Sequence, residues 1–242
     1  MTSEFAGKSA LVTGASRGIG RAIAEELYAS GTHIIPVARP SDDLTDLVNG
    51  CDRDRCSPWE GDATSDECLA HIQAQGRIDI LVNNVGTNVP KMMTDVDDAT
   101  LDLMINLNIR ATYRISRTVL SVMPEGGRII NITSQMGHVG SPRRTVYCMT
   151  KHAIEGLTKA MAVELAPRGI RVNSVAPTFV ETPLTRPMLS DPEFSAFVEQ
   201  MIPLGQIAQP KDVAKAVAYL AGQGGNMVTG HSLIVDGGWT AH

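Results

Sequence analysis

Short apolar runs alternate with longer amphipathic stretches along most of the chain, and this alternation restricts the fold more than any other feature. The apolar runs predict strands over Ser9–Thr13, His33–Ala38, Trp59–Gly61, Ile78–Asn83, Arg128–Thr133, Arg171–Ala176 and Ser232–Val235. The amphipathic stretches predict helices over Ile19–Ala29, Leu44–Val48, Asp66–Gln75, Asp98–Val122, Val146–Leu165 and Lys211–Leu220. Strands separated by helices indicate right-handed βαβ units, and therefore a doubly wound α/β fold with a parallel sheet of about seven strands.

Two segments fit this pattern poorly. Pro36 lies inside the second predicted strand, where a central strand would need the N–H that proline lacks. The stretch from Glu181 to Gln209 holds four prolines and is the least regular part of the chain. We interpret it as an insertion at the carboxyl edge of the sheet, not as a separate domain.

Length alone leaves between one and two domains, but α/β units of about 200–250 residues often form one, and we expect a single domain over residues 1–242. The chain is 43% hydrophobic and 19% charged, which is ample for a packed core and unlike a disordered segment. No apolar run reaches the roughly 18 residues of a membrane helix. Residues Met1–Lys8 do not resemble a signal peptide, so we expect a cytoplasmic protein without a membrane partner.

The net charge and the spacing of cysteines and histidines disfavour two further classes, nucleic-acid-binding proteins and metalloproteins. The net charge is −5, the pI is about 5.7 and the basic residues are scattered, which disfavours a nucleic-acid partner. Four cysteines and six histidines fit no zinc spacing, so we expect free thiols and no metal.

A glycine-rich segment, Thr13–Gly20, follows the first predicted strand and leads into a helix. Glycines allow a tight turn and a close approach to a pyrophosphate, and the helix N-terminus offers free N–H groups. The spacing G-x-x-x-G-x-G differs from the commonest dinucleotide motif and also suits an ordinary turn, but its place after the first strand favours phosphate binding.

Tyr147 and Lys151 lie four residues apart on a predicted helix and so share one face. A lysine cation one turn away should lower the pKa of the tyrosine and suit it to acid–base chemistry on an alcohol or carbonyl. Such a pair also arises by chance, but Ser134 directly follows a predicted strand, at the edge where these sheets bind ligands.

Seven motifs together resemble the short-chain dehydrogenase/reductase family, in its compact single-domain branch. They are TGASRGIG at 13–20, NNVG at 83–86, INLN at 105–108, INITS at 130–134, YCMTK at 147–151, RVNSVAP at 171–177 and VDGG at 235–238. They occur in the family's order and cover essentially the whole chain. The resemblance implies a Rossmann-type fold and hydride transfer between a nicotinamide cofactor and an alcohol or carbonyl carbon.

The resemblance also implies roles for four residues. Tyr147 would be the general acid in reduction and the base in oxidation, and Lys151 would lower its pKa and bind the nicotinamide ribose. Ser134 would hydrogen-bond the substrate oxygen. Asn108 would hold a water of a proton relay, with Asn106 a close competitor for that role.

The cofactor site follows from the same resemblance. The cofactor-binding residues besides Tyr147 and Lys151 would be Gly14, Ser16, Arg17, Gly18, Ile19, Gly20, Arg39, Asp62, Ala63, Asn84, Val85, Gly86, Pro177 and Thr182. Two positions depart from the family pattern. Val85 replaces an alanine, and Thr178 replaces a glycine and could touch substrate.

Cofactor preference depends on the end of the second predicted strand. An acid there would grip the ribose of NAD(H), but this chain has Ala38 followed by Arg39. Arg39 and Arg17 could bind a 2′-phosphate, so we expect NADP(H) to be favoured, with NAD(H) possible. Asp42 and Asp43 follow shortly after Arg39 and weaken the distinction between NADP(H) and NAD(H) preference. The alternative is that Arg39 is solvated and binds no phosphate.

The substrate is less well defined by the sequence. Met136, His138 and Thr178 should line the pocket, beneath a lid at about 182–205. Arg143 and Arg144 could attract an anionic group, but we expect them to be solvated. We predict a small hydroxy or keto compound such as a sugar, polyol or keto acid, with 3-oxoacyl-carrier-protein reduction as the alternative.

Two expectations concern the whole molecule. A nucleotide-sensing subunit without turnover is the alternative of another class, because a fold does not establish a function. Family members are commonly homotetramers joined through two long helices and the last strand. Ala153, Leu157, Ala160 and Met161 on the predicted helix permit such an assembly.

Overall fold

Seven parallel strands form one sheet in a computed structural model of the chain, which describes residues 4–241. The strand order is β3-β2-β1-β4-β5-β6-β7, so the winding direction reverses between β1 and β4. The strands are β1 (Ser9–Thr13), β2 (His33–Ala38), β3 (Trp59–Glu60), β4 (Ile80–Asn83), β5 (Arg128–Ile132), β6 (Arg171–Pro177) and β7 (Ser232–Val235). The expected doubly wound sheet is confirmed, and ligands in such sheets bind at the carboxyl edge beside the reversal.

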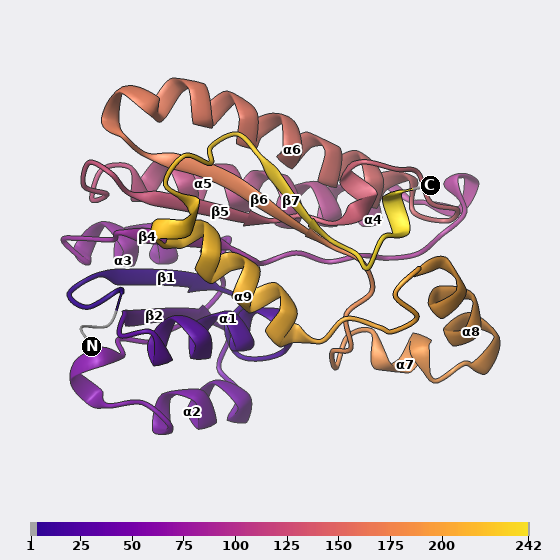
Figure 1. Cartoon of the computed structure of the whole chain (residues 1–242), viewed down its shortest axis with the longest axis horizontal. Helices are drawn as coiled ribbons and strands as arrows, with labels where there is room; N and C mark the ends of the chain where they lie inside the picture. The colour runs from indigo at the N-terminus through magenta and orange to yellow at the C-terminus, as the bar shows by residue number, and fades with distance from the viewer. Residues whose placement is uncertain (1–3, 242) are drawn as a thin grey trace.

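Helices cover both faces of the sheet (Figure 1). One face carries α1 (Gly18–Ala29), α2 (Asp42–Asn49) and α9 (Pro210–Ala221). The other carries α3 (Asp66–Ala74), α5 (Ala111–Val119) and α6 (Thr145–Leu165), and α4 (Asp98–Met104) leads towards α5. The short helices α7 (Arg186–Leu189) and α8 (Pro192–Met201) project beyond the carboxyl ends of the strands.

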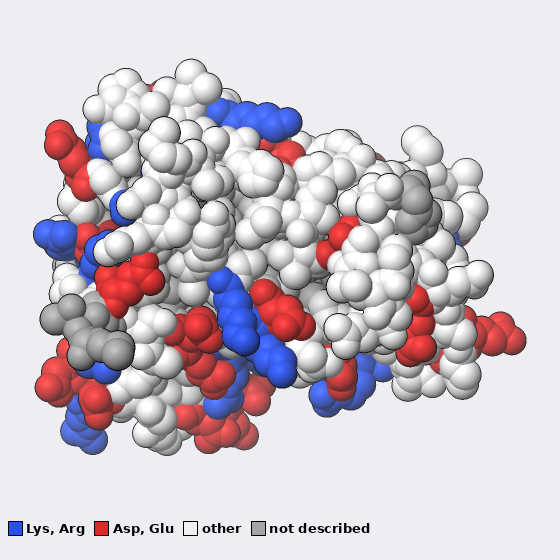
Figure 2. Space-filling view, viewed as in Figure 1, with Lys and Arg blue, Asp and Glu red and all other residues white. Residues whose placement is uncertain are grey.

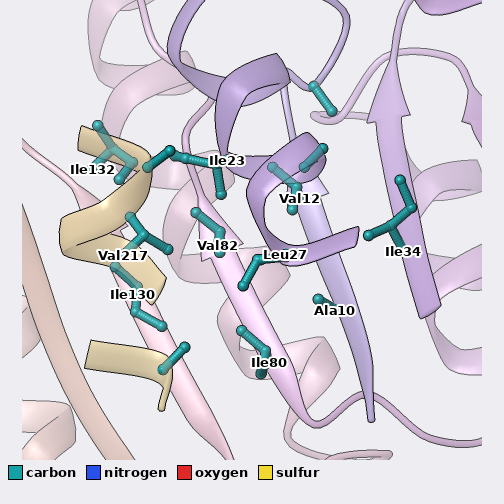
Figure 3. Close-up of a cluster of buried hydrophobic side chains, with 14 of the residues drawn as sticks. Ala10, Val12, Ile23, Leu27, Ile34, Ile80, Val82, Ile130, Ile132 and Val217 are labelled. Atoms are coloured by element: carbon teal, nitrogen blue, oxygen red, sulfur yellow. The ribbon is translucent and has the colours of Figure 1, made fainter. Parts of the chain in front are cut away.

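The core is divided between the two faces because strand side chains alternate in direction. Val12, Val82 and Ile130 pack with Ile23 and other residues of the first helical layer (Figure 3). Their strand neighbours, such as Leu11, Leu81 and Ile129, pack into the second layer. Near-continuous apolar strands are what a parallel sheet buried on both sides requires.

Pro36 is accommodated in β2 because of the direction in which its nitrogen points. The carbonyls of Ile34 and Ala38 accept from Ser57 and Gly61, on the β3 side of the strand. Pro36 shares their direction, and β3 begins only at Trp59, which pairs with the next residue, Val37. The missing N–H therefore lies outside the β1–β2 ladder.

Two helix predictions need correction. The predicted helix Asp98–Val122 is not uniform, because a π-helical segment, Ile105–Arg110, separates α4 from α5, which ends at Val119. The irregular stretch Glu181–Gln209 contains α7 and α8. The start of α8 has a signal that we overlooked, since Asp191 caps it, Pro192 is its first residue and Glu193 follows.

The surface bears on the expected partners. No helix within residues 4–241 is long and apolar enough to cross a membrane. Acidic and basic side chains are interspersed on the face shown in Figure 2. The outward side of α6 exposes Met149, Ala153, Ala160 and Val163, which suits the predicted contact with another copy, but the homotetramer stays a prediction.

Gly20 fixes the first turn of α1 against the glycine-rich segment. A Cβ at Gly20 would lie 2.2 Å from the carbonyl oxygen of Gly14 and 2.5 Å from Nδ2 of Asn84. We expect Gly20→Ala to lower the free energy of unfolding by about 1–3 kcal/mol, measured by urea denaturation, because backbone must move to admit the methyl group.

Gly50→Ala is the matched control. Gly50 is exposed at the end of α2, has φ −78° and would place its Cβ no closer than 3.5 Å to another atom. We expect a change within about 0.5 kcal/mol. Equal effects of the two substitutions would contradict the close contact at Gly20.

Candidate active site

Ser134 and Tyr147 face one cavity of about 210 Å³ at the carboxyl edge of the sheet. Ser134 follows β5 and caps a short turn, with its Oγ accepting from the N–H of Met136 at 3.1 Å. Tyr147 lies in the first turn of α6, and the Ser134 side chain is close enough to lower its pKa. Two hydroxyl groups, one after β5 and one on α6, therefore meet where a small polar molecule could bind.

Burial dominates the acid–base behaviour of Tyr147. Desolvation raises the pKa of Tyr147 to about 12, against the opposing effects of the Ser134 hydrogen bond and the Arg144 charge. Ser134 and Arg144 lower this pKa. Lys151 Nζ lies 5.5 Å from the ring centroid of Tyr147, within reach of a cation–ring contact, and its expected lowering of the pKa stays a prediction.

Lys151 is buried beside Tyr147, and its Nζ donates to the carbonyl of Ile132 at 2.9 Å. Burial lowers the pKa of Lys151 to about 8, while the nearby Glu155 carboxylate raises it. Lys151 is thus cationic at neutral pH but close to losing its proton.

Asn108 lies in the π-helical segment and is 2% exposed. Its Oδ1 accepts from the N–H of Thr87 at 2.8 Å, and its Nδ2 donates to the carbonyl of Thr87 and to Oγ1 of Thr150. The amide thereby joins the loop after β4 to α6. The competitor, Asn106, is exposed, which favours Asn108 for a role inside the site.

Glu155 continues the same helix face below Lys151. Its carboxylate accepts from the hydroxyl groups of Thr133, Ser174 and Ser232. His138, which we expected to line the substrate pocket, instead has its Nε2 at 2.9 Å from Oγ of Ser232 and 3.4 Å from Oε1 of Glu155. The ring thus turns towards this polar cluster, and contact of His138 with substrate stays a prediction.

The glycine-rich segment has the shape expected of a phosphate-binding turn. Gly14 and Gly18 have φ values of 65° and 60°, in the left-handed region that favours glycine. Arg17 precedes α1 without a side-chain cap, and no acidic residue lies in the first turn. The N–H groups of Gly18, Ile19 and Gly20 therefore begin a helix that can receive an anion, beside the partly exposed Ser16.

Asn84 contacts the glycine-rich segment directly. Its Nδ2 donates to the carbonyls of Thr13 and Gly14 at 2.9 and 3.2 Å, and its expected place near the adenosine ribose stays a prediction. Val85 donates its N–H to Oγ1 of Thr13, and Gly86 is exposed beside Asn108 and Lys151. The side chain of Asn84 thus supports the glycine-rich segment from behind.

The remaining predicted cofactor residues also lie at this edge. Arg39 directly follows β2 and is exposed, and its charge lowers the pKa of Asp62, although the hydrogen bonds from Thr64 are the larger cause. Ala63, next to Asp62, is buried. Pro177 ends β6, and Thr182 lies against Gly18, where a Cβ would be 3.4 Å away. A dinucleotide laid across the edge could touch all of them.

The substrate side of the edge contains two adjoining cavities. The inner one, which Ser134 and Tyr147 face, is lined by Met136 and Thr178, as expected. The outer one, about 670 Å³, lies under the predicted lid and is lined by residues of α7 and α8, including Met188, Phe194 and Phe197.

Several lining residues were missed in the sequence, namely Asn88, Gln135, Phe179 and Arg144. Arg144 was expected to be solvated but is 9% exposed and lines both cavities, so that expectation was wrong. The signal in the sequence that Arg144 lies near the site was its spacing of three residues, about one helical turn, from Tyr147. Its neighbour Arg143 is exposed, as expected.

Known proteins resemble the chain over its full length. A family model described as enoyl-(acyl carrier protein) reductase matches residues 14–240. L-xylulose reductase of Bos taurus is 36% identical over 249 positions and 100% of both chains. The 3-oxoacyl-(acyl-carrier-protein) reductase of Haemophilus influenzae is 40% identical over 240 positions, covering 96% of this chain and 98% of its own.

A solved structure gives the same result. It is a Beutenbergia cavernae protein, provisionally described as an NAD(P)-dependent gluconate 5-dehydrogenase, with NADP bound at low occupancy. It has a TM-score of 0.91 and 34% identity, covering 100% of both chains. The motifs, the sheet order and these relatives agree, and the chain belongs to the short-chain dehydrogenase/reductase family, oxidoreductases that act on CH–OH and C=O groups.

Proposed function

We propose that the protein is an NADP(H)-preferring oxidoreductase that interconverts a secondary alcohol and a ketone or aldehyde in a small hydroxy or keto compound. The observation that carries this proposal is the meeting of the Ser134 and Tyr147 hydroxyl groups at one 210 Å³ cavity. Relatives named for L-xylulose and gluconate support a sugar-like substrate.

The chain's own residues would bind and protonate the substrate oxygen. In reduction, Ser134 donates a hydrogen bond to the carbonyl oxygen, and Tyr147 transfers its proton there. A raised pKa keeps Tyr147 protonated and ready to donate, and the Lys151 cation stabilises the phenolate that remains. In oxidation the proton moves back to Tyr147.

NADP(H), when bound, supplies or accepts the hydride. The uncapped N-terminus of α1 and the left-handed glycines form a turn that fits its pyrophosphate. Lys151 and Gly86 lie beside Asn108 at the edge where the ribose would be held. Arg39 and Arg17 are both exposed near this turn and would face a 2′-phosphate.

A second candidate function is the reduction of a 3-oxoacyl group carried by a protein. The outer cavity favours it, because Phe179, Phe194 and Trp239 give an apolar chamber that could take an acyl chain. The inner cavity favours the small polar substrate, because buried polar atoms of Asn88, Gln135 and Thr178 line it. A comparison of both substrate types therefore belongs in the first assay.

Tyr147→Phe tests the proposed proton transfer. We expect the variant to lose about 10²–10⁴-fold or more of kcat with any substrate of a panel of sugars, polyols, keto acids and a 3-oxoacyl thioester, because no acid replaces the phenol. Cofactor absorbance measures turnover, and calorimetry should show NADPH binding within about threefold of the wild type.

The matched control is Tyr113→Phe, at an exposed tyrosine of α5. It should leave kcat unchanged. Full activity in Tyr147→Phe would refute the mechanism. Cofactor binding without turnover in the wild type across the panel would support the sensing subunit instead.

The charge state of Lys151 predicts the pH dependence of reduction. Burial lowers its pKa from 10.5 to about 8, so the cation is present below pH 8 and is lost above it. We expect log kcat/KM for carbonyl reduction to be flat below about pH 8 and to fall above it, because a neutral amine cannot stabilise the phenolate.

Glu155→Gln provides a directional check on this profile. The Glu155 carboxylate raises the pKa of Lys151, so its removal should move the falling limb to lower pH. A limb that stays in place, or a wild-type profile that is flat to pH 10, would show that Lys151 does not control the rate.

Arg39→Gln tests the cofactor preference. We expect it to lower kcat/KM with NADPH by about 10–100-fold and to leave kcat/KM with NADH within about threefold of the wild-type value. Only NADPH carries the phosphate that Arg39 would bind. Arg53→Gln removes an equally exposed arginine beyond α2 and should change neither value. A wild-type enzyme at least as efficient with NADH would contradict the preference.

A further inference from the structure

Arg144 is a buried cation at the mouth of the inner cavity. It is 9% exposed, directly precedes α6 and contributes to the walls of both cavities. It lies three residues before Tyr147, so the two side chains are neighbours at the start of the same helix. A charged side chain in this position faces whatever molecule occupies the cavity beside Tyr147.

The guanidinium has few partners for a buried charge. One NH2 group lies 3.9 Å from the sulfur of Met188, and the charge lies 5.6 Å from the ring centroid of Phe179. Its Nε is buried without a hydrogen bond. No aspartate or glutamate within residues 4–241 forms an ion pair with Arg144. Buried arginines are normally paired, because an unpaired buried charge is costly.

Other unsatisfied polar atoms surround the same cavity. Within residues 4–241, six buried side-chain polar atoms lack a hydrogen-bond partner, and four of the six belong to residues that line the inner cavity. These four atoms are Nε of Arg144, Oδ1 of Asn88, Oε1 of Gln135 and Oγ1 of Thr178. The residues around the Ser134–Tyr147 pair therefore include one cation and three neutral side chains that each hold a buried polar atom without a partner.

The acidic residue of the outer cavity does not neutralise Arg144. Asp191 is exposed, and its Oδ1 accepts from the N–H groups of Glu193 and Phe194 to cap α8. The second arginine, Arg143, is exposed, and its backbone has a positive φ of 61°. The local charge of the cavity is therefore positive.

We propose that the substrate is a hydroxy or keto acid whose carboxylate binds Arg144 and whose other hydroxyl groups lie in the inner cavity, which Asn88, Gln135 and Thr178 line. The proposal rests on the function proposed above and narrows its substrate class. A guanidinium presents its donors as a planar fork that matches a carboxylate, and the pairing satisfies a charge that the protein leaves unpaired. Because Arg144 and Tyr147 are one helical turn apart, the carboxylate lies only a few bonds from the reacting carbon.

Matched substrates and matched variants test this proposal. The substrates are gluconate and several shorter polyhydroxy acids, each paired with the polyol that has CH₂OH in place of the carboxylate. We expect the wild type to oxidise at least one acid more efficiently than its polyol. Arg144→Gln should lower kcat/KM for that acid about 10–100-fold more than it lowers kcat/KM for the matched polyol, and the additional loss should lie mainly in KM, because any effect through Tyr147 is common to both substrates. Arg143→Gln, with the same change of charge on an exposed neighbour, should change neither.

Binding gives a readout that needs no turnover. With NADP⁺ present, the preferred acid should raise the melting temperature of the wild type and of Arg143→Gln, but not that of Arg144→Gln, and its polyol should have a smaller effect. Equal losses for acid and polyol in Arg144→Gln would overturn the proposal and show that Arg144 acts only through Tyr147. The proposal also fails if no acid shifts the melting temperature, or if polyols are preferred throughout.

Failure of the proposed carboxylate site and failure of the proposed function give different results. A wild type that oxidises the polyols but not the acids contradicts the carboxylate and keeps the proposed function. A wild type that binds the acids through Arg144 but turns over none of them keeps the carboxylate site and contradicts the proposed function.

Discussion

The side-chain amide of Asn84 holds together the point at which the sheet reverses its winding. It donates to the carbonyls of Thr13 and Gly14 at the end of β1, while Oγ1 of Thr13 accepts from the backbone of Asn84 and Val85 after β4. These bonds fix two loops that the reversal would otherwise let separate. The turn that can receive a phosphate and the loop that reaches Asn108 are therefore positioned by the side chains of Asn84 and Thr13.

The first half of α6 and the residue directly before it carry the chemistry, because three ionisable side chains of the helix share one face and Arg144 precedes them. Arg144, Tyr147, Lys151 and Glu155 follow one another at intervals of three or four residues from the cavity towards the core. The environments of these four side chains change from one residue to the next. Arg144 has no acidic partner, Tyr147 is raised in pKa by burial, Lys151 is lowered, and Glu155 is held by three hydroxyl groups. Burial of Lys151 is tolerated because Glu155 lies one turn further along.

The sequence predicted what depends on local pattern and missed what depends on contacts across the sheet. The strands followed from apolar runs, and Ser134 and Tyr147 followed from motifs. The π-helical segment at Asn108 could not be read from periodicity, because one extra residue in a turn hardly changes an apolar pattern. The contact between His138 and Ser232 could not be predicted, because the two residues are far apart in the sequence. Arg144 was misjudged because burial of an arginine is rare without a partner in the chain.

The unpaired atoms of the inner cavity affect stability and binding in opposite directions. A buried guanidinium and three buried oxygens without hydrogen bonds destabilise the fold by the desolvation they have undergone. The same desolvation has already been completed when a ligand arrives, so a complementary ligand gains most of its interaction free energy without paying for it again. A ligand without a negative charge would leave the Arg144 cation as it is in the free protein. Such a cavity therefore discriminates between ligands less by shape than by a free-energy penalty. This penalty is that of the unpaired Arg144 cation, and it persists when an uncharged molecule is bound.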